Sequence, residues 1–123
     1  MDVQQLATQI RLDIANGISD GASLRAVRQF IMDVERAENP AELVNRDPGS
    51  TGDSRWDALV AGVGEDLAYR LGFEVPKWTR CEPLTTFWFF SEYPKTHPTA
   101  FVETPAALAR RGVFIRRDSL INV

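Results

Sequence analysis

Apolar side chains recur at helical spacing along residues 54–71, and this stretch limits the possible folds more than any other. Its apolar face contains Trp56, Leu59, Val60, Val63, Leu67 and Leu71. Asp53 or Ser54 can cap the first turn, Asp57 lies at the spacing of a capping box, and Gly72 suits the end. We therefore predict a helix over 54–71 whose apolar face must be covered by other parts of the chain.

Two glycines lie inside this predicted helix. Gly62 and Gly64 each cost about 1 kcal/mol relative to alanine in a helix interior. Tertiary packing must therefore hold the helix together, and we expect another backbone to approach closely at these glycines.

A helical hairpin is predicted before this helix. Apolar residues at helical spacing indicate helices over 3–16 and 23–37, with Ser23 as the cap of the second. The connection between them is short, which favours an antiparallel pair. Residues 37–52 follow and are too rich in turn-forming residues to be regular throughout.

The last third of the chain has weaker signals. Pro94 and Pro98 are expected to interrupt regular structure after the aromatic run 85–90. Thr104-Pro105 then marks the start of a short helix over 105–111, because proline suits the first helical position. The β-prone triplet Val113–Ile115 is able to pair with the aromatic run.

These signals predict a mainly α fold. The expected small helical domain has a helical hairpin, a long central helix, a short C-terminal helix and at most a small two-stranded β element. A chain of 123 residues fits one domain over 1–123, in which 1–46 form the hairpin subregion, 47–52 a linker and 53–123 the remainder.

Charge is divided unevenly along the chain. Residues 1–66 contain twelve acids and six bases, a net −6, whereas 67–123 contain five acids and eight bases, a net +3. Such a dipolar arrangement can steer association with a charged partner, although ordinary solvated faces are the favoured explanation.

The sequence offers few residues for catalysis. Cys81 is the one cysteine and His97 the one histidine, so neither a disulfide nor a histidine pair for zinc can form within the chain. Nothing orients Cys81 and His97 as a nucleophile and base, and the glycines match no phosphate-binding spacing. We therefore expect no enzyme activity, no cofactor and no metal. The single cysteine and the absence of a signal peptide or membrane span favour a cytoplasmic protein.

Aromatic residues gather in the middle of the sequence, and they allow two interpretations. A core cluster is favoured, because large rings supply the burial that a small domain needs. A stacking platform for single-stranded nucleic acid is the alternative, since Lys77, Arg80 and Lys95 lie nearby. We expect the apolar face of the central helix to pack against this run. The residues of the cluster are Trp56, Trp78, Phe87, Trp88, Phe89 and Phe90.

An arginine cluster is the candidate binding site. Arg110, Arg111, Arg116 and Arg117 lie within eight residues. If the chain turns at Gly112, their side chains share an edge suited to phosphate or to an acidic protein surface. The alternative is that they complement the end of the predicted helix and are otherwise solvated.

Four blocks of the sequence resemble a family of uncharacterised proteins common in actinobacteria. The blocks are Thr51–Gly62, Val75–Thr79, Phe87–Phe90 and Thr104–Ile115. In that family the matching region commonly follows a helix-turn-helix and is similar to the partner of a neighbouring nucleotidyltransferase-like protein, as in toxin–antitoxin pairs. The resemblance covers about residues 51–123 and implies no catalytic residues. Residues 1–46 depart from it, because two amphipathic helices replace the DNA-reading module.

The favoured hypothesis is therefore a non-enzymatic protein-interaction module of bacterial origin. An antitoxin-like partner of a nucleotidyltransferase-type protein, or a homo-oligomer, would fit it. The alternative is a nucleic-acid-binding transcriptional regulator, which the net −6 of the first half disfavours.

Overall fold

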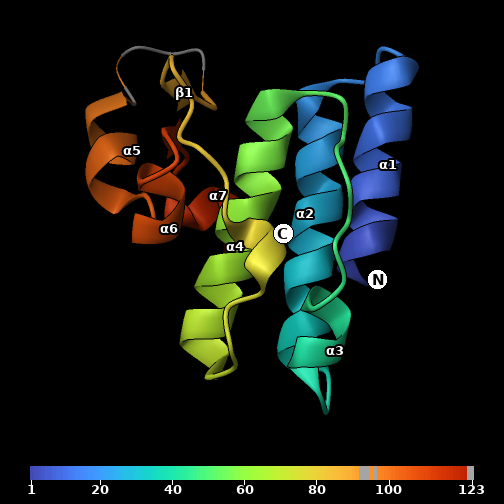
Figure 1. Ribbon diagram of the computed structural model, residues 1–123. Helices are drawn as coiled ribbons and strands as arrows, with labels where there is room; N and C mark the ends of the chain where they lie inside the picture. Colours follow the sequence, from blue (N-terminus) through green and yellow to red (C-terminus); the bar gives the residue numbers. More distant parts are fainter. Residues whose placement is uncertain (92–94, 96, 122–123) are drawn as a thin grey trace.

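The computed structural model describes residues 1–91, 95 and 97–121 and is mainly helical, as predicted (Figure 1). Helices α1 (Val3–Ala15) and α2 (Asp20–Arg36) form the expected antiparallel hairpin. Helix α2 begins three residues earlier than predicted, after Ser19. Ser23 is therefore not its cap but lies within the helix, where its hydroxyl donates to Asp13 Oδ2 at 3.1 Å.

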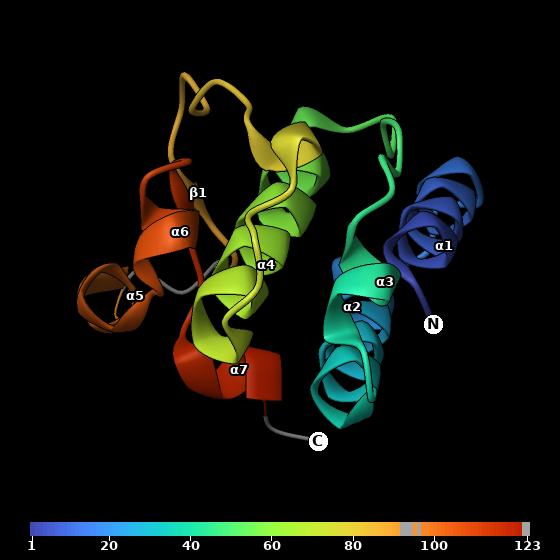
Figure 2. The same cartoon turned by 60° about the horizontal axis from the view of Figure 1, so that its bottom comes forward.

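Helix α4 (Ser54–Leu71) occupies the predicted residues and stands at the centre of the molecule (Figures 1 and 2). The Asp53 carboxylate accepts from Arg55 N–H at 2.8 Å, and Gly72 ends the helix with a φ of 77°. Asp57 does not complete a capping box. Its Oδ1 instead accepts from the N–H and the hydroxyl of Thr51, both at 2.7 Å, and so folds the preceding loop onto the helix.

Two helices of the structure were not predicted, α3 (Pro40–Val44) and α5 (His97–Glu103). Helix α7 (Arg117–Ile121) lies where the sequence indicates a final turn that reaches Leu120, with Asp118 as its expected cap. The prediction that Pro98 interrupts structure was wrong, because this proline lies in the first turn of α5, where no backbone N–H is needed. Pro94 lies outside the described residues.

The remaining elements form a small β-α-β unit. Strands β1 (Trp88–Phe89) and β2 (Val113–Phe114) pair in parallel, with Trp88 opposite Val113. The chain passes between them through α5 and α6 (Ala106–Ala109), and a 3-10 turn, η1 (Lys77–Thr79), precedes β1. The two-stranded element is thus confirmed, and the predicted helix 105–111 is shorter than expected.

Thr104 joins the end of α5 to the end of β2 rather than capping α6. Its hydroxyl donates to the Ala100 carbonyl, and its oxygen accepts from the Ile115 N–H at 3.0 Å. Because Thr104 is buried, these hydrogen bonds fix the point where the β-α-β unit closes.

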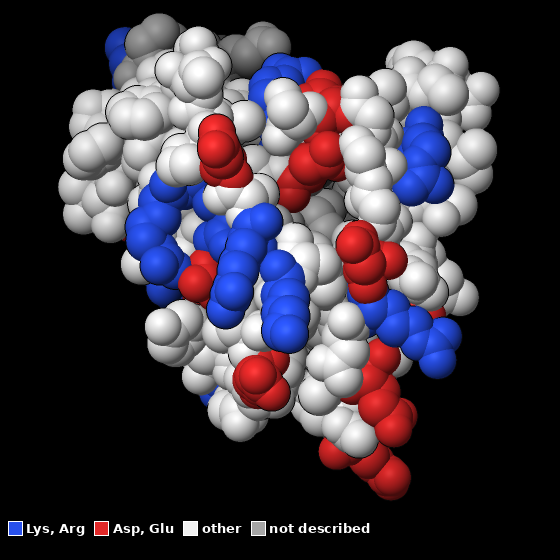
Figure 3. Space-filling model, in the orientation of Figure 1, with Lys and Arg blue, Asp and Glu red and all other residues white. Residues whose placement is uncertain are grey.

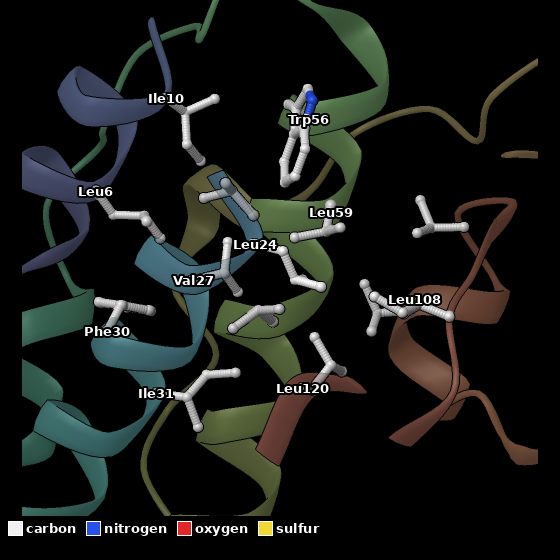
Figure 4. Packing of buried hydrophobic residues seen from close by; sticks show 14 of the residues in the cluster. Leu6, Ile10, Leu24, Val27, Phe30, Ile31, Trp56, Leu59, Leu108 and Leu120 are labelled. Atoms are coloured by element: carbon white, nitrogen blue, oxygen red, sulfur yellow. The ribbon is translucent and has the colours of Figure 1, made fainter. Parts of the chain in front are cut away.

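The hydrophobic core surrounds α4 on two sides. Side chains of the hairpin point toward α4 from one side, and Leu108 of α6 approaches from the other (Figure 4). Trp56 meets the aromatic run edge-on, with ring centroids 5.3 Å from Trp88 and 5.9 Å from Phe90, which confirms the predicted contact for this residue. None of the helices in the described part of the chain combines the length and apolarity required to cross a membrane.

Candidate functional site

Two of the four candidate arginines converge on one buried carboxylate of α4. Arg110 Nη2 and Arg111 Nη1 each lie 2.5 Å from an oxygen of Glu65. Arg111 is buried and also donates to the carbonyls of Ala107 at 2.6 Å and Thr79 at 2.8 Å. Its guanidinium therefore ties α4, α6 and η1 together and is not displayed on a surface.

The protonation of Glu65 reflects this pairing. Burial raises the pKa of Glu65, but the hydrogen bonds from Arg111 and Arg110 outweigh burial and hold the pKa below its usual range. A buried carboxylate that is doubly paired in this way remains ionised at neutral pH, so the cluster of three groups carries a net positive charge.

The other two arginines lie elsewhere, so the four do not share one edge. Arg116 Nε is 3.5 Å from Glu103 Oε2 of α5, and both side chains are half exposed. Arg117 begins α7 and is exposed. The alternative that these cations complement the end of the predicted helix fits Arg111, which donates to the Ala107 carbonyl of α6, and Arg110, which directly follows α6.

The structure assembles a different basic surface from two distant segments. The hydrogen bond from Arg111 to the Thr79 carbonyl brings η1 beside α6. Lys77 and Arg80 at η1 and Arg110 after α6 are all exposed, and we call these three residues the basic face. Figure 3 shows Lys and Arg side chains gathered over this part of the molecule. Sequence reasoning missed the basic face because its segments lie about thirty residues apart.

The predicted aromatic cluster is divided between core and surface. Trp56 and Trp88 are buried, whereas Trp78, Phe89 and Phe90 are half-buried. The Trp78 Nε1 donates to the Val44 carbonyl at 2.7 Å, which joins η1 to α3. Phe87 is 60% exposed and so does not belong to the core.

Phe87 belongs to an exposed group of apolar side chains around the β-α-β unit. Its ring centroid lies 5.1 Å from that of Phe114, and Phe101 of α5 stacks on Phe114 at the same 5.1 Å. Phe101 is 59% and its neighbour Val102 is 81% exposed. We call the exposed Phe87, Phe101 and Val102, together with the buried Phe114 that both rings contact, the aromatic patch. Phe101 and Phe114 were not singled out from the sequence, where nothing links them to Phe87.

His97 and Cys81 show no catalytic arrangement. The His97 ring stacks on Phe89 with centroids 4.2 Å apart, and its Nε2 lies 2.8 Å from the Ser91 carbonyl oxygen. Cys81 is exposed, and no interaction between described residues joins it to His97. Within residues 1–91, 95 and 97–121, no group of three potential ligands is arranged to hold a metal ion.

Comparisons of the chain with protein-family models, curated proteins and solved structures give no match.

Proposed function

We propose that this chain is a non-enzymatic protein-interaction module that binds its partner through the aromatic patch. The observation that carries the proposal is the exposure of Phe87 and Phe101, 60% and 59%, while both rings contact one supporting ring, Phe114. Large apolar side chains that are exposed close to one another mark interaction sites, whereas exposed side chains that are scattered singly need no explanation.

The construction of the patch suits binding. Both rings rest on Phe114, which is itself buried in β2, so little side-chain entropy is lost when a partner covers them. Aromatic side chains are enriched among the residues that dominate binding energy. Glu103 at the end of α5 forms an ion pair with Arg116, which directly follows Ile115. This pair supplies polar groups near the apolar centre of the patch.

The sequence resemblance supports a particular class of partner. It includes the segments that contain Phe87 and Phe114, and the resembling proteins neighbour nucleotidyltransferase-like proteins. We therefore propose an antitoxin-like role in which the aromatic patch contacts a nucleotidyltransferase-type protein. Self-association through the same patch would produce a homo-oligomer instead.

Capture of partner proteins from the native host, in which a nucleotidyltransferase-type protein should be recovered with the chain, tests the proposal. Phe87→Ser and Phe101→Ser should each weaken the complex at least tenfold, since each removes a large apolar contact. Tyr69→Ser is the matched control, because Tyr69 is 72% exposed on α4 outside the patch. Unchanged affinity in both phenylalanine variants would refute the proposal, and concentration-dependent elution of the chain alone would identify self-association.

The basic face supports a second candidate, a nucleic-acid-binding regulator. Lys77, Arg80 and Arg110 are exposed together and can contact phosphates. Three exposed cations are few for a duplex-binding surface, however, and the first half of the chain carries a net −6. If this candidate is right, the chain binds duplex DNA with an affinity that falls steeply as the salt concentration rises. The double substitution Arg80→Glu with Arg110→Glu should then abolish this binding.

A further inference from the structure

A second surface feature lies apart from the aromatic patch, where α2, α4, α6 and α7 meet. It is a cavity of about 250 Å³. Its apolar lining comes from all four helices and from the residue before α6: Ile31, Val63, Pro105, Leu108 and Leu120. Figure 4 shows Ile31, Leu108 and Leu120 among the residues around α4. Such a lining, with a few polar groups at its edge, is the general composition of a small-molecule site.

One side of the cavity carries surplus negative charge. Arg70 Nη1 donates to Glu35 Oε2 and Arg70 Nε to Asp66 Oδ2, both at 2.9 Å. All three residues line the cavity, and together they sum to one negative charge. Within the described part of the chain, no group donates to Glu35 Oε1 or Asp66 Oδ1. Two carboxylate oxygens therefore remain able to accept hydrogen bonds from a cation.

The opposite charge comes from a different helix. Arg117 of α7 lines the same cavity and forms no hydrogen bond or ion pair with any other described residue. Its guanidinium can therefore donate to an anionic group, and a carboxylate suits it because two parallel hydrogen bonds can form.

We propose that this cavity binds a small zwitterion with an apolar body, of which a free aliphatic amino acid is the simplest form. The ammonium group contacts Glu35 and Asp66, the carboxylate contacts Arg117, and the side chain lies over the apolar floor, whose residues are themselves buried. The volume of about 250 Å³ accommodates a ligand of this size. This site goes beyond the proposed interaction function and does not depend on it.

The two charged walls distinguish a zwitterion from simpler ligands. An amine alone leaves Arg117 unpaired, and an acid alone places no charge opposite Glu35 and Asp66. A hydrogen bond to a charged group contributes about 1.5–3 kcal/mol, so loss of either contact weakens binding about tenfold or more.

Titration of the isotope-labelled full chain, followed by nuclear magnetic resonance, tests the proposal with three probes: L-leucine, isovalerate and isoamylamine. L-Leucine should bind at least tenfold more tightly than the other two and shift the methyl signals of Ile31, Val63, Leu108 and Leu120. Equal affinity for all three probes would overturn the zwitterion assignment. Absence of L-leucine binding up to its solubility limit would overturn the site.

Substitutions then locate the contacts. Arg117→Gln should weaken L-leucine binding at least tenfold without changing the weak binding of isoamylamine. It should not affect folding, because Arg117 forms no hydrogen bond or ion pair with another residue that the structure describes. Asp66→Asn should weaken L-leucine and isoamylamine alike. The control is Arg116→Gln, since Arg116 is the preceding residue and does not line the cavity. If Arg117→Gln binds L-leucine like the parent chain, the proposed carboxylate contact is wrong.

Discussion

Leu108 of α6 lies directly against the backbone of Gly62 in α4. A Cβ at position 62 would lie 2.5 Å from Leu108 Cδ2, 3.0 Å from its Cγ and 3.2 Å from its Cα. Because the Leu108 Cα is included, rotation of the leucine side chain alone does not make room. The close approach of another backbone, which the sequence predicts at the two glycines of α4, is thus confirmed for Gly62. At Gly64 the neighbours are side chains, those of Trp78 and Thr79.

Gly62→Ala should destabilise the protein. Alanine favours the helix by about 1 kcal/mol, but overpacking of a core contact costs about 1–3 kcal/mol, and here backbone as well as side chain must move. We expect a net loss that lowers the free energy of unfolding measured by urea denaturation.

Gly21→Ala is the matched control for this substitution. Gly21 also lies in a helix, but the nearest atom to an added Cβ is Ser19 Oγ at 3.9 Å. The helix preference should therefore act alone and stabilise the protein by up to about 1 kcal/mol. If both variants gain stability, α6 is not in close contact with α4 in solution.

Arg111→Leu should cost about 3–5 kcal/mol, because it removes the buried partner of Glu65 and leaves the Thr79 carbonyl without its donor. Arg110 pairs with the same carboxylate, but its side chain is 60% exposed, so Arg110→Leu should cost at most about 1 kcal/mol. Thermal unfolding of the two variants checks this difference. Similar losses would show that Arg111 is not the buried member of the pair.

Acid should destabilise the protein partly through Glu65. Its pKa in the folded chain lies below the ordinary 4.5, so the unfolded chain takes up a proton first as the pH falls. The stabilisation is complete above the unfolded pKa and is lost as the pH falls through the folded pKa. The Glu65→Gln variant should therefore be less stable than the parent chain at neutral pH. Its free energy of unfolding should fall less steeply than that of the parent chain below about pH 5. Parallel profiles of the free energy of unfolding against pH for the parent chain and the variant would contradict this role of Glu65.

A feature of the fold could be predicted from the sequence when the residues that cause it lie close together in the chain. Helix α4 was predicted at both ends because Asp53, Gly72 and the apolar spacing all lie within its own sequence. Helices α3 and α5 were missed because they span only five and seven residues, too few for an apolar spacing to indicate a helix. The pairing of Glu65 with Arg111 joins residues 46 apart, and no local pattern indicates it. The same reason explains why the aromatic patch was not foreseen, since Phe114 brings Phe87 and Phe101 together only after the strands pair.

Trp56→Ala should cause the largest loss of stability among single substitutions in the aromatic cluster. The Trp56 side chain is 1% exposed, contacts Trp88 and Phe90 edge-on, and donates from Nε1 to Asp20 Oδ1 at 3.3 Å, so it joins α4 both to the hairpin and to β1. Truncation of a buried tryptophan costs about 3–5 kcal/mol, which is a large share of the total stability of a domain of this size.

The control for Trp56→Ala is Tyr69→Ala, which removes a large ring of the same helix that is 72% exposed. It should change the melting temperature little, because surface substitutions away from specific contacts stay within about 0.5 kcal/mol. An unchanged melting temperature in Trp56→Ala would mean that Trp56 is exposed in solution. The aromatic run would then be available to stack on nucleic acid bases, and the platform interpretation would replace the core one.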